Sequence, residues 1–172
     1  GFIYSGKIDG TDVYAFAPHQ DKLKANAGKI GFVPAPTVKA LVQSVDTVII
    51  ACKPYQIEEV LKSVSEDLEG KALVSVAAGW GYEQYEAILG NKVRIQCIMP
   101  NTPSMVGEGV LLFENKNSLT DNEKSEIIDL FSCLGLVEEI PSALMGIGGA
   151  ISGCGPAFMD MIMESYADAA VK

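Results

Sequence analysis

The chain has 172 residues, of which 48% are hydrophobic and 20% are charged, and its formal net charge is −9 at pH 7. This composition is typical of one folded domain with the beginning of another, and the negative charge without a basic cluster argues against nucleic acid or an anionic membrane surface as a partner. The four cysteines form no Cys-x-x-Cys pair and have no histidine nearby, so we expect neither a metal site nor a disulfide framework.

The first part of the chain has short apolar stretches separated by turn residues. Residues 1–3 have the composition of a strand fragment, but they run abruptly into Tyr4 with no helix between. The following elements are expected to be a strand at residues 12–16, a short helix from Asp21 with Leu23 and Ala27 facing inward, an extended stretch at 33–36 and a short helix at 37–44.

The middle of the chain alternates strands and helices. Residues 45–52 form a nearly continuous apolar run rich in β-branched residues, which is typical of a parallel strand covered on both faces. A helix after Pro54, a strand at 72–77, a helix at 82–89 and a strand at 93–99 follow. This order predicts a doubly wound, mainly parallel sheet.

Beyond this alternation we expect two further strands and one helix. Residues 109–113 predict a strand that suits an antiparallel position at the sheet edge. A capping box at Thr120 opens a helix that stops at Gly135, and residues 136–140 predict a last strand.

A glycine-rich stretch, residues 150–158, precedes a helix from Phe158 to Lys172. Gly153 and Gly155 allow backbone angles that a side chain would forbid, and Pro156 suits the first turn of a helix. We therefore predict a sharp turn here. It would join a dinucleotide-binding domain of residues 1–150 to the truncated start of a helical domain, residues 151–172.

Three loops leave predicted strands where open α/β sheets bind their ligands, namely residues 51–54, 76–79 and 99–103. Their small residues let the backbone approach a flat ligand, and Lys53 beside them suits a phosphate or carboxylate. Small residues also serve ordinary turns, and a lysine before a proline is often only solvated. The sequence shows no Ser/His/Asp or metal-ligand constellation, and its one histidine, His19, is expected at the surface.

Four motifs in their order and spacing resemble the pyrroline-5-carboxylate reductases. They are Cys52-Lys53-Pro54, Ser75-Val76-Ala77-Ala78-Gly79, Ile98-Met99-Pro100-Asn101-Thr102-Pro103 and Ile151-Ser152-Gly153-Cys154-Gly155-Pro156-Ala157-Phe158. The resemblance covers most of the chain. It implies a Rossmann-like domain followed by a helical domain that forms a homodimer or a higher homo-oligomer. The implied reaction is the reduction of 1-pyrroline-5-carboxylate to L-proline with NADPH or NADH, the last step of proline biosynthesis.

The resemblance also implies roles for individual residues. Those that would line the cofactor are Ala51, Cys52, Lys53 and Pro54, and those beside its nicotinamide half are Val76, Ala77, Ala78 and Gly79. Asn101 and Thr102 would lie close to the same pocket. Ser152, Gly153 and Gly155 would mark a hinge between the two domains. No catalytic residue is assigned, because a protonated imine is already electrophilic.

The chain departs from the family pattern in three ways. The Gly-x-Gly-x-x-Gly loop that should follow residues 1–3, and the helix that normally holds the pyrophosphate, are absent, so we infer an omission between Ile3 and Tyr4. The turn at 17–20 lacks an arginine for a 2′-phosphate, and Val38 stands where an asparagine commonly faces the adenosine half. The choice between NADPH and NADH therefore stays open. The family's substrate-carboxylate contacts lie beyond Lys172.

The sequence also predicts a cellular location and leaves two alternative functions open. No apolar run reaches the roughly 18 residues that span a bilayer, and no signal peptide opens the chain, which favours the cytoplasm. The alternatives are another small Rossmann reductase, acting on a different carbon or on a deazaflavin, and a dinucleotide-binding protein without turnover.

Overall fold

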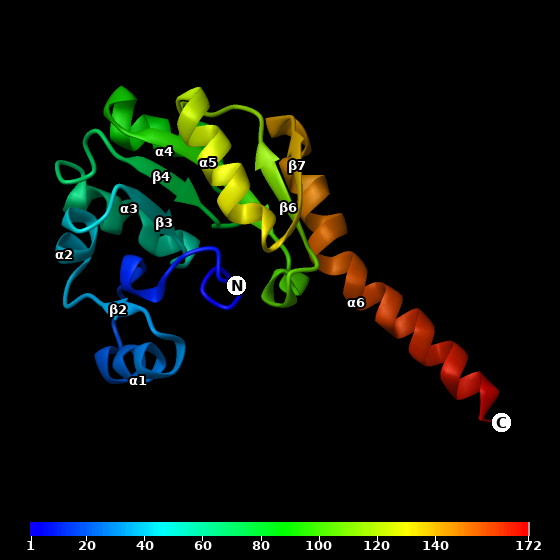
Figure 1. The fold of residues 1–172 in the computed structure, drawn as a ribbon. Helices are drawn as coiled ribbons and strands as arrows, with labels where there is room; N and C mark the ends of the chain where they lie inside the picture. The colour runs from blue at the N-terminus through cyan, green and yellow to red at the C-terminus, as the bar shows by residue number, and fades with distance from the viewer. Residues whose placement is uncertain (172) are drawn as a thin grey trace.

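The centre of the molecule is a five-stranded sheet with the strand order β3-β4-β5-β6-β7 (Figure 1). In this computed structural model, which describes residues 1–171, the strands are β3 (Thr47–Ile50), β4 (Ala72–Ser75), β5 (Arg94–Pro100), β6 (Gly109–Glu114) and β7 (Gly135–Ile140). All neighbours are parallel except β5 and β6. The predicted mainly parallel, Rossmann-like α/β fold is confirmed. The expectation that β6 lies at the edge is wrong, because β7 pairs in parallel with its outer side.

Helices lie on both faces of this sheet, as in a doubly wound fold. On one face lie α3 (Pro54–Val64) and α4 (Tyr82–Leu89), and on the other lies α5 (Asp121–Ser132). Consecutive residues of a strand point to opposite faces. Thus Leu73 packs with Leu61 and Tyr85 in one buried cluster, while Val74 packs with Ile127 in the second. The expectation that the strand at residues 45–52 is covered on both faces is wrong, because alternate residues of β3 are exposed and Ile49 is 40% exposed.

The N-terminal part forms a smaller layer beside the central sheet. Its elements are the short 3-10 helix η1 (Gly10–Asp12), the parallel pair β1 (Tyr14–Ala15) and β2 (Val33–Pro34), and the helices α1 (Gln20–Ile30) and α2 (Val38–Gln43). The predicted inward residues of α1, Leu23 and Ala27, are buried. Thr37 caps α2 by accepting a hydrogen bond from the backbone N–H of Ala40.

The strand expected at residues 1–3 is not formed. The backbone N–H of Ser5 donates to the carbonyl of Gly1 at 2.9 Å, and that of Gly6 donates to Ile3 at 3.0 Å, so the backbone turns through Ile3 and Tyr4. The apolar character of this segment serves packing instead. The ring of Phe2 meets Phe131 of α5 edge to face, with centroids 5.0 Å apart.

A single helix, α6 (Met145–Ala170), ends the described chain and projects away from the sheet (Figure 1). The turn predicted at residues 150–158 is therefore wrong, because Gly153 and Gly155 are helical and Pro156 lies inside the helix. The expected domain boundary between residues 150 and 151 falls within this helix. Short 3-10 helices occur at η2 (Gly90–Lys92), η3 (Thr102–Val106) and η4 (Ser142–Leu144).

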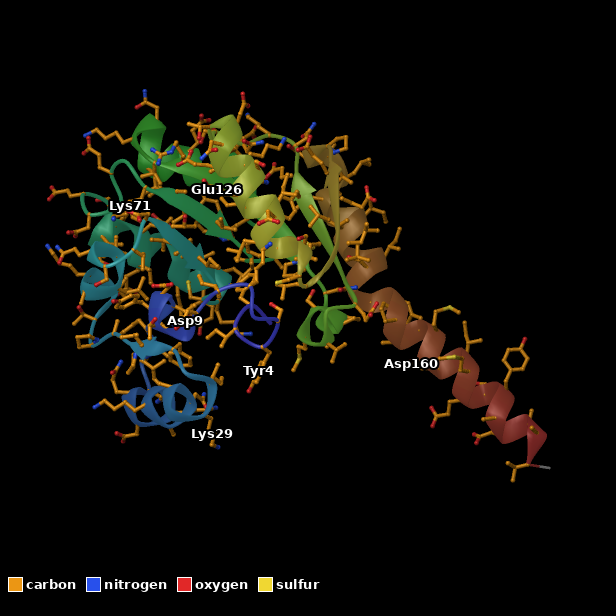
Figure 2. All side chains as sticks on the ribbon, viewed as in Figure 1. Tyr4, Asp9, Lys29, Lys71, Glu126 and Asp160 are labelled. Carbon is orange, nitrogen blue, oxygen red and sulfur yellow. The ribbon has the colours of Figure 1, made fainter. Side chains whose placement is uncertain are left out.

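No described residue of α6 is buried. In Figure 2 the side chains of the outer part of α6, with Asp160 among them, stand clear of the rest of the molecule, whereas its first turns lie against the sheet. The segment Ser142–Ala170 is long and apolar enough to cross a membrane by length and composition, with a mean hydropathy of 1.2. The expectation that no stretch meets this criterion is therefore wrong. A helix that is covered by other protein surface meets the same criterion.

Candidate functional site

A cavity of about 750 Å³ lies where β1, β3 and β4 end, and we call it the first cavity. Its wall is formed by residues 14–18, which are β1 and the turn after it, by 48–54 around the end of β3 and by 76–78 after β4, with α2 and α3 closing it. The segments after β3 and β4 meet because the carboxyl ends of parallel strands lie at one edge of a sheet, and the segment from β1 lines the same cavity. Seven of the residues named from the sequence line it together, namely Ala51, Cys52, Lys53, Pro54, Val76, Ala77 and Ala78.

Lys53 is the only charged residue among the described residues that line the first cavity. It directly precedes α3, with Pro54 at the first position of the helix, and its backbone N–H donates to Oε1 of Gln56 at 3.3 Å. The positive end of a helix dipole and an ammonium group thus lie together at the rim. This combination suits a phosphate or another anionic group of a ligand.

Apart from Gln56 and the hydroxyl-bearing Tyr14, the rest of the first cavity is lined by apolar or small residues. Phe16, Pro18 and Val38 contribute to the wall, and Val38 is the position where the family resemblance places the adenosine half. Burial raises the pKa of the Cys52 thiol, so this group is protonated at neutral pH and does not act as a thiolate nucleophile. The chemistry available here is binding and orientation of a ligand.

The loop after β4 is held by a buried hydrogen-bond network that the sequence analysis missed. Oγ of Ser75 lies 2.6 Å from the hydroxyl of Tyr85, and the backbone N–H of Ala77 donates to the same Oγ at 3.2 Å. Burial raises the pKa of Tyr85 and keeps its hydroxyl neutral. A polar serine inside an otherwise apolar strand was the signal for this network. It fixes the loop whose small residues face the cavity.

Gly79 lines a different cavity from the other predicted residues. A second cavity of about 390 Å³ shares Ala77 with the first cavity and lies between the start of α4, strands β5 and β6 and the start of α6. Gly79 lines it, and its φ of +79° is one that side chains rarely adopt, which lets the backbone turn from β4 into α4. The two cavities are therefore neighbours along one loop.

Asn101 and Thr102 line neither cavity. Thr102 begins η3, whereas the amide of Asn101 makes two hydrogen bonds that connect elements. Its Nδ2 donates to the carbonyl of Ser152 in α6 at 3.0 Å, and its Oδ1 accepts from the backbone N–H of Val110 at 2.9 Å. Pro156 has no N–H for the carbonyl four residues earlier, which is that of Ser152. Asn101 thus satisfies the acceptor that the proline leaves free.

The residues that were expected to form a hinge lie at or next to this contact between Asn101 and α6. Ser152, Gly153 and Gly155 are all helical residues of α6, so the chain forms no loop at them. Nothing lies within 4 Å of the Cβ position of Gly153 or Gly155. The contact between Asn101 and Ser152, which joins the loop after β5 to α6, is the feature that the sequence did not reveal.

Comparison with known proteins identifies the family. Residues 1–79 match the family model described as NADP oxidoreductase coenzyme F420-dependent. The chain is 33% identical over 176 residues to the pyrroline-5-carboxylate reductase of Treponema pallidum, covering 100% of this chain and 66% of the relative. It is 30% identical to that of Escherichia coli over 99% of this chain and 64% of the relative. The chain belongs to the pyrroline-5-carboxylate reductase family.

Solved structures of this family share the fold. The pyrroline-5-carboxylate reductase of Coxiella burnetii matches with a TM-score of 0.90 and 27% identity, over 98% of this chain and 64% of that one. A Plasmodium falciparum pyrroline carboxylate reductase with NADP bound matches with a TM-score of 0.86 and 28% identity, over 99% and 62%. The chain spans about two thirds of the length of these family members.

The alignment with the Treponema family member bears on the inferred omission. It covers all of this chain in 176 positions, four more than the 172 residues of the chain. A glycine-rich loop with the helix that follows it needs more than four positions. This comparison therefore argues against an omission between Ile3 and Tyr4.

Proposed function

We propose that this protein reduces 1-pyrroline-5-carboxylate to L-proline with NADPH or NADH. The observation that carries the proposal is the first cavity, in which the residues of two family motifs, around Lys53 and Ala77, form one wall in a member of this family. A volume of about 750 Å³ with apolar walls and one lysine fits a nicotinamide dinucleotide. The ten residues proposed to contact or adjoin the cofactor remain Ala51, Cys52, Lys53, Pro54, Val76, Ala77, Ala78, Gly79, Asn101 and Thr102.

The chemistry divides between cofactor and protein. When bound, the dinucleotide supplies the hydride from its nicotinamide ring. Lys53 and the start of α3 bind an anionic group of the dinucleotide and fix its position along the rim. Ala77 and Ala78 allow a flat ring to lie against the backbone, and Phe16 and Pro18 exclude water from the cavity. Asn101 acts indirectly in this scheme, because its amide holds the loop after β5 against α6.

The exposed helix α6 supports a homodimer or a higher homo-oligomer. Three large apolar side chains, Phe158, Met161 and Tyr166, are more than 60% exposed on it. Contiguous apolar surface of this kind marks protein interfaces. We place the protein in the cytoplasm, since all four cysteines are free thiols, as a reducing compartment maintains.

The test is oxidation of NADPH and NADH by purified protein with 1-pyrroline-5-carboxylate, other cyclic imines and ketones. Oxidation that is selective for 1-pyrroline-5-carboxylate supports the proposal, and the ratio of the kcat/KM values for the two dinucleotides gives the cofactor preference. Dinucleotide binding without oxidation by any substrate would contradict it and favour a non-catalytic dinucleotide-binding protein.

A second candidate is a reductase of a deazaflavin. The observation that favours it is the match of residues 1–79 to the family model of coenzyme F420-dependent NADP oxidoreductases. Adding coenzyme F420 to the same assay separates the two functions. NADPH oxidation that depends on coenzyme F420 and not on 1-pyrroline-5-carboxylate would establish this candidate.

A further inference from the structure

Tyr85 is a fully buried tyrosine of α4 next to the loop that the two cavities share. It is 0% exposed and lines neither cavity. Its hydroxyl lies 2.6 Å from Oγ of Ser75, the last residue of β4, which is 1% exposed. Ser75 pairs with Ile50, the last residue of β3, on one side and with Cys97 of β5 on the other. The pair of hydroxyls is therefore buried where β3 and β4 end.

The loop after β4 is held at both of its ends. At its start, the backbone N–H of Ala77 donates to Oγ of Ser75 at 3.2 Å, and the N–H of Val76 donates to the last carbonyl of β3 at 3.0 Å. At its far end, Trp80 packs against the ring of Tyr85 with centroids 5.2 Å apart. Tyr85 thus contacts the loop at its far end directly and at its start through Ser75.

The loop after β3 packs against the same tyrosine cluster. Cys52, which lines the first cavity, lies against the apolar cluster that contains Tyr85. Burial raises the pKa of the Tyr85 hydroxyl most, and the nearby thiols of Cys97 and Cys52 raise it further. The hydroxyl is therefore a neutral hydrogen-bonding group, and its contribution is to position its neighbours.

Burial of apolar surface alone does not explain a polar pair at this place. Phenylalanine and alanine would fill nearly the same space, and replacing both partners of a hydrogen bond by apolar groups is often nearly neutral for stability. A hydrogen bond has a direction that an apolar contact lacks, so a satisfied buried pair fixes one arrangement of the residues around it. Here the residue held in this way is Ala77, the only described residue that lines both cavities.

We propose that Tyr85 and Ser75 are positioning residues that hold Ala77 and Ala78 in the orientation required to align the nicotinamide ring of the dinucleotide. This inference rests on the proposed function. Neither residue touches the ligand, and both act through the backbone of Ala77. Lys53 and the start of α3 bind the dinucleotide elsewhere, so loss of the pair should loosen the ring without releasing the ligand. Hydride transfer is sensitive to such loosening, because a misplacement of about 1 Å can cost about a hundredfold in rate.

The test separates orientation of the ring from stability of the fold. Tyr85→Phe removes one hydroxyl, Ser75→Ala also removes the acceptor of the Ala77 N–H, and the double variant removes both partners. The control is Ile127→Val, a loss of volume in the cluster on the opposite face of the sheet, where Ile127 is 4% exposed.

Three quantities are measured for each protein. The rate of hydride transfer from NADPH to 1-pyrroline-5-carboxylate is measured in single turnovers. Fluorescence without substrate gives the Kd for NADPH and the emission of the bound nicotinamide at saturation, which falls when the ring is held less rigidly. The thermal unfolding midpoint reports the stability of the fold.

The rate and the affinity should respond differently. Tyr85→Phe should lower the rate of hydride transfer by about three- to tenfold and Ser75→Ala by about tenfold or more, while the Kd for NADPH changes by less than about twofold. The emission of bound NADPH should fall in both variants. The double variant should unfold at a higher temperature than Ser75→Ala, because no hydroxyl is left buried without a partner, yet its rate should stay as low. Ile127→Val should lower the unfolding midpoint and leave the rate and the emission unchanged.

The proposal is overturned if Tyr85→Phe has the wild-type rate and emission, or if the rate of the double variant recovers together with its unfolding midpoint. It is also overturned if Ile127→Val loses rate as the other variants do, which a purely structural role would produce. Failure of the proposed function alone has a different signature, namely wild-type protein that binds NADPH but transfers no hydride to 1-pyrroline-5-carboxylate. The emission of bound NADPH then still decides whether Tyr85 and Ser75 position the ring. Wild-type protein that binds no NADPH would overturn both.

Discussion

The central sheet and helix α6 use apolar residues in opposite ways. Phe113 of β6 is 1% exposed and packs edge to face on Phe131 with ring centroids 5.9 Å apart. Phe158 of α6 is 63% exposed, and none of the described residues of its helix is buried. The sheet therefore derives its stability from burial within the chain. The apolar surface of α6 gains this stabilisation only from a second surface.

The central sheet and α6 are connected at Asn101, whose side chain makes one hydrogen bond to Ser152 of α6 and one to Val110 of β6. This junction combines apolar contact, in which Gly148 and Gly149 of α6 lie close to the side chains of Leu112 and Met99, with these two hydrogen bonds. The bond to Ser152 compensates for the N–H that Pro156 lacks. The proposed dinucleotide loops and the proposed dimer helix are thus connected through a polar group. Substitutions in the sheet, in α6 and at this junction should therefore change the free energy of unfolding by different amounts.

The largest expected difference in the free energy of unfolding is between substitutions of Phe113 and of Phe158. Phe113→Ala should lower the free energy of unfolding by about 3 to 5 kcal/mol, because a buried aromatic ring is lost and a cavity remains. Phe158→Ala should change it by less than about 0.5 kcal/mol in dilute solution, where no partner covers the ring. Urea denaturation at several protein concentrations measures both. Equal costs for the two variants in dilute solution would contradict the comparison.

The next effect concerns the junction. Asn101→Ala should cost about 1 to 3 kcal/mol, because the carbonyl of Ser152 and the N–H of Val110 lose their partner. Pro156→Ala restores an N–H for the carbonyl of Ser152, so the double variant should be destabilised less than Asn101→Ala alone. A double-mutant cycle measures this coupling. Strict additivity would show that the two residues do not share this acceptor.

A salt bridge within the sheet region should contribute less. Arg94 Nε donates to both carboxylate oxygens of Glu123 at 2.7 and 2.8 Å, and its terminal nitrogen donates to the carbonyl of Gly70 at 2.8 Å. We expect Arg94→Met to lower the free energy of unfolding by about 1 to 2 kcal/mol at neutral pH. Thermal unfolding of the variant and the wild type across a pH series measures the difference.

The pH dependence of that difference follows from Glu123. The hydrogen bonds from Arg94 lower the pKa of Glu123 below its ordinary value of 4.5. The pair therefore contributes fully above pH 4.5 and is lost as the pH falls through the lowered pKa of the folded state. Wild type and Arg94→Met should converge in stability in acid. A difference that grows in acid would contradict this assignment.

The smallest expected effect is on cofactor affinity. Lys53→Ala should raise the KM for NADPH by about three- to tenfold, with a smaller change in kcat, because a binding contact at the exposed rim is lost. Lys39→Ala is the control, since Lys39 lies on α2 outside the first cavity and pairs with Asp67. An unchanged KM for Lys53→Ala in steady-state kinetics would remove Lys53 from the proposed site.

Local patterns in the sequence were enough to predict most helices and strands of the sheet domain. The apolar run at residues 45–52 and the spacing of Ile57 and Leu61 predicted β3 and α3, because burial imposes these periods on a chain. Strand order then brought the loops around Lys53 and Ala77 into one cavity, as parallel topology requires. That much of the candidate site followed from chain order alone.

Contacts between distant residues decided the rest. Pro156 is a poor residue for the inside of a helix, and the sequence alone favoured a turn there; Asn101, 55 positions earlier, supplies the donor that the helix lacks. Glu114 likewise has no local signal, because its burial depends on the start of α4 packing over β6. Periodicity records which side of an element is covered. It does not record which polar partner arrives from another part of the chain, and only the tertiary structure places that partner.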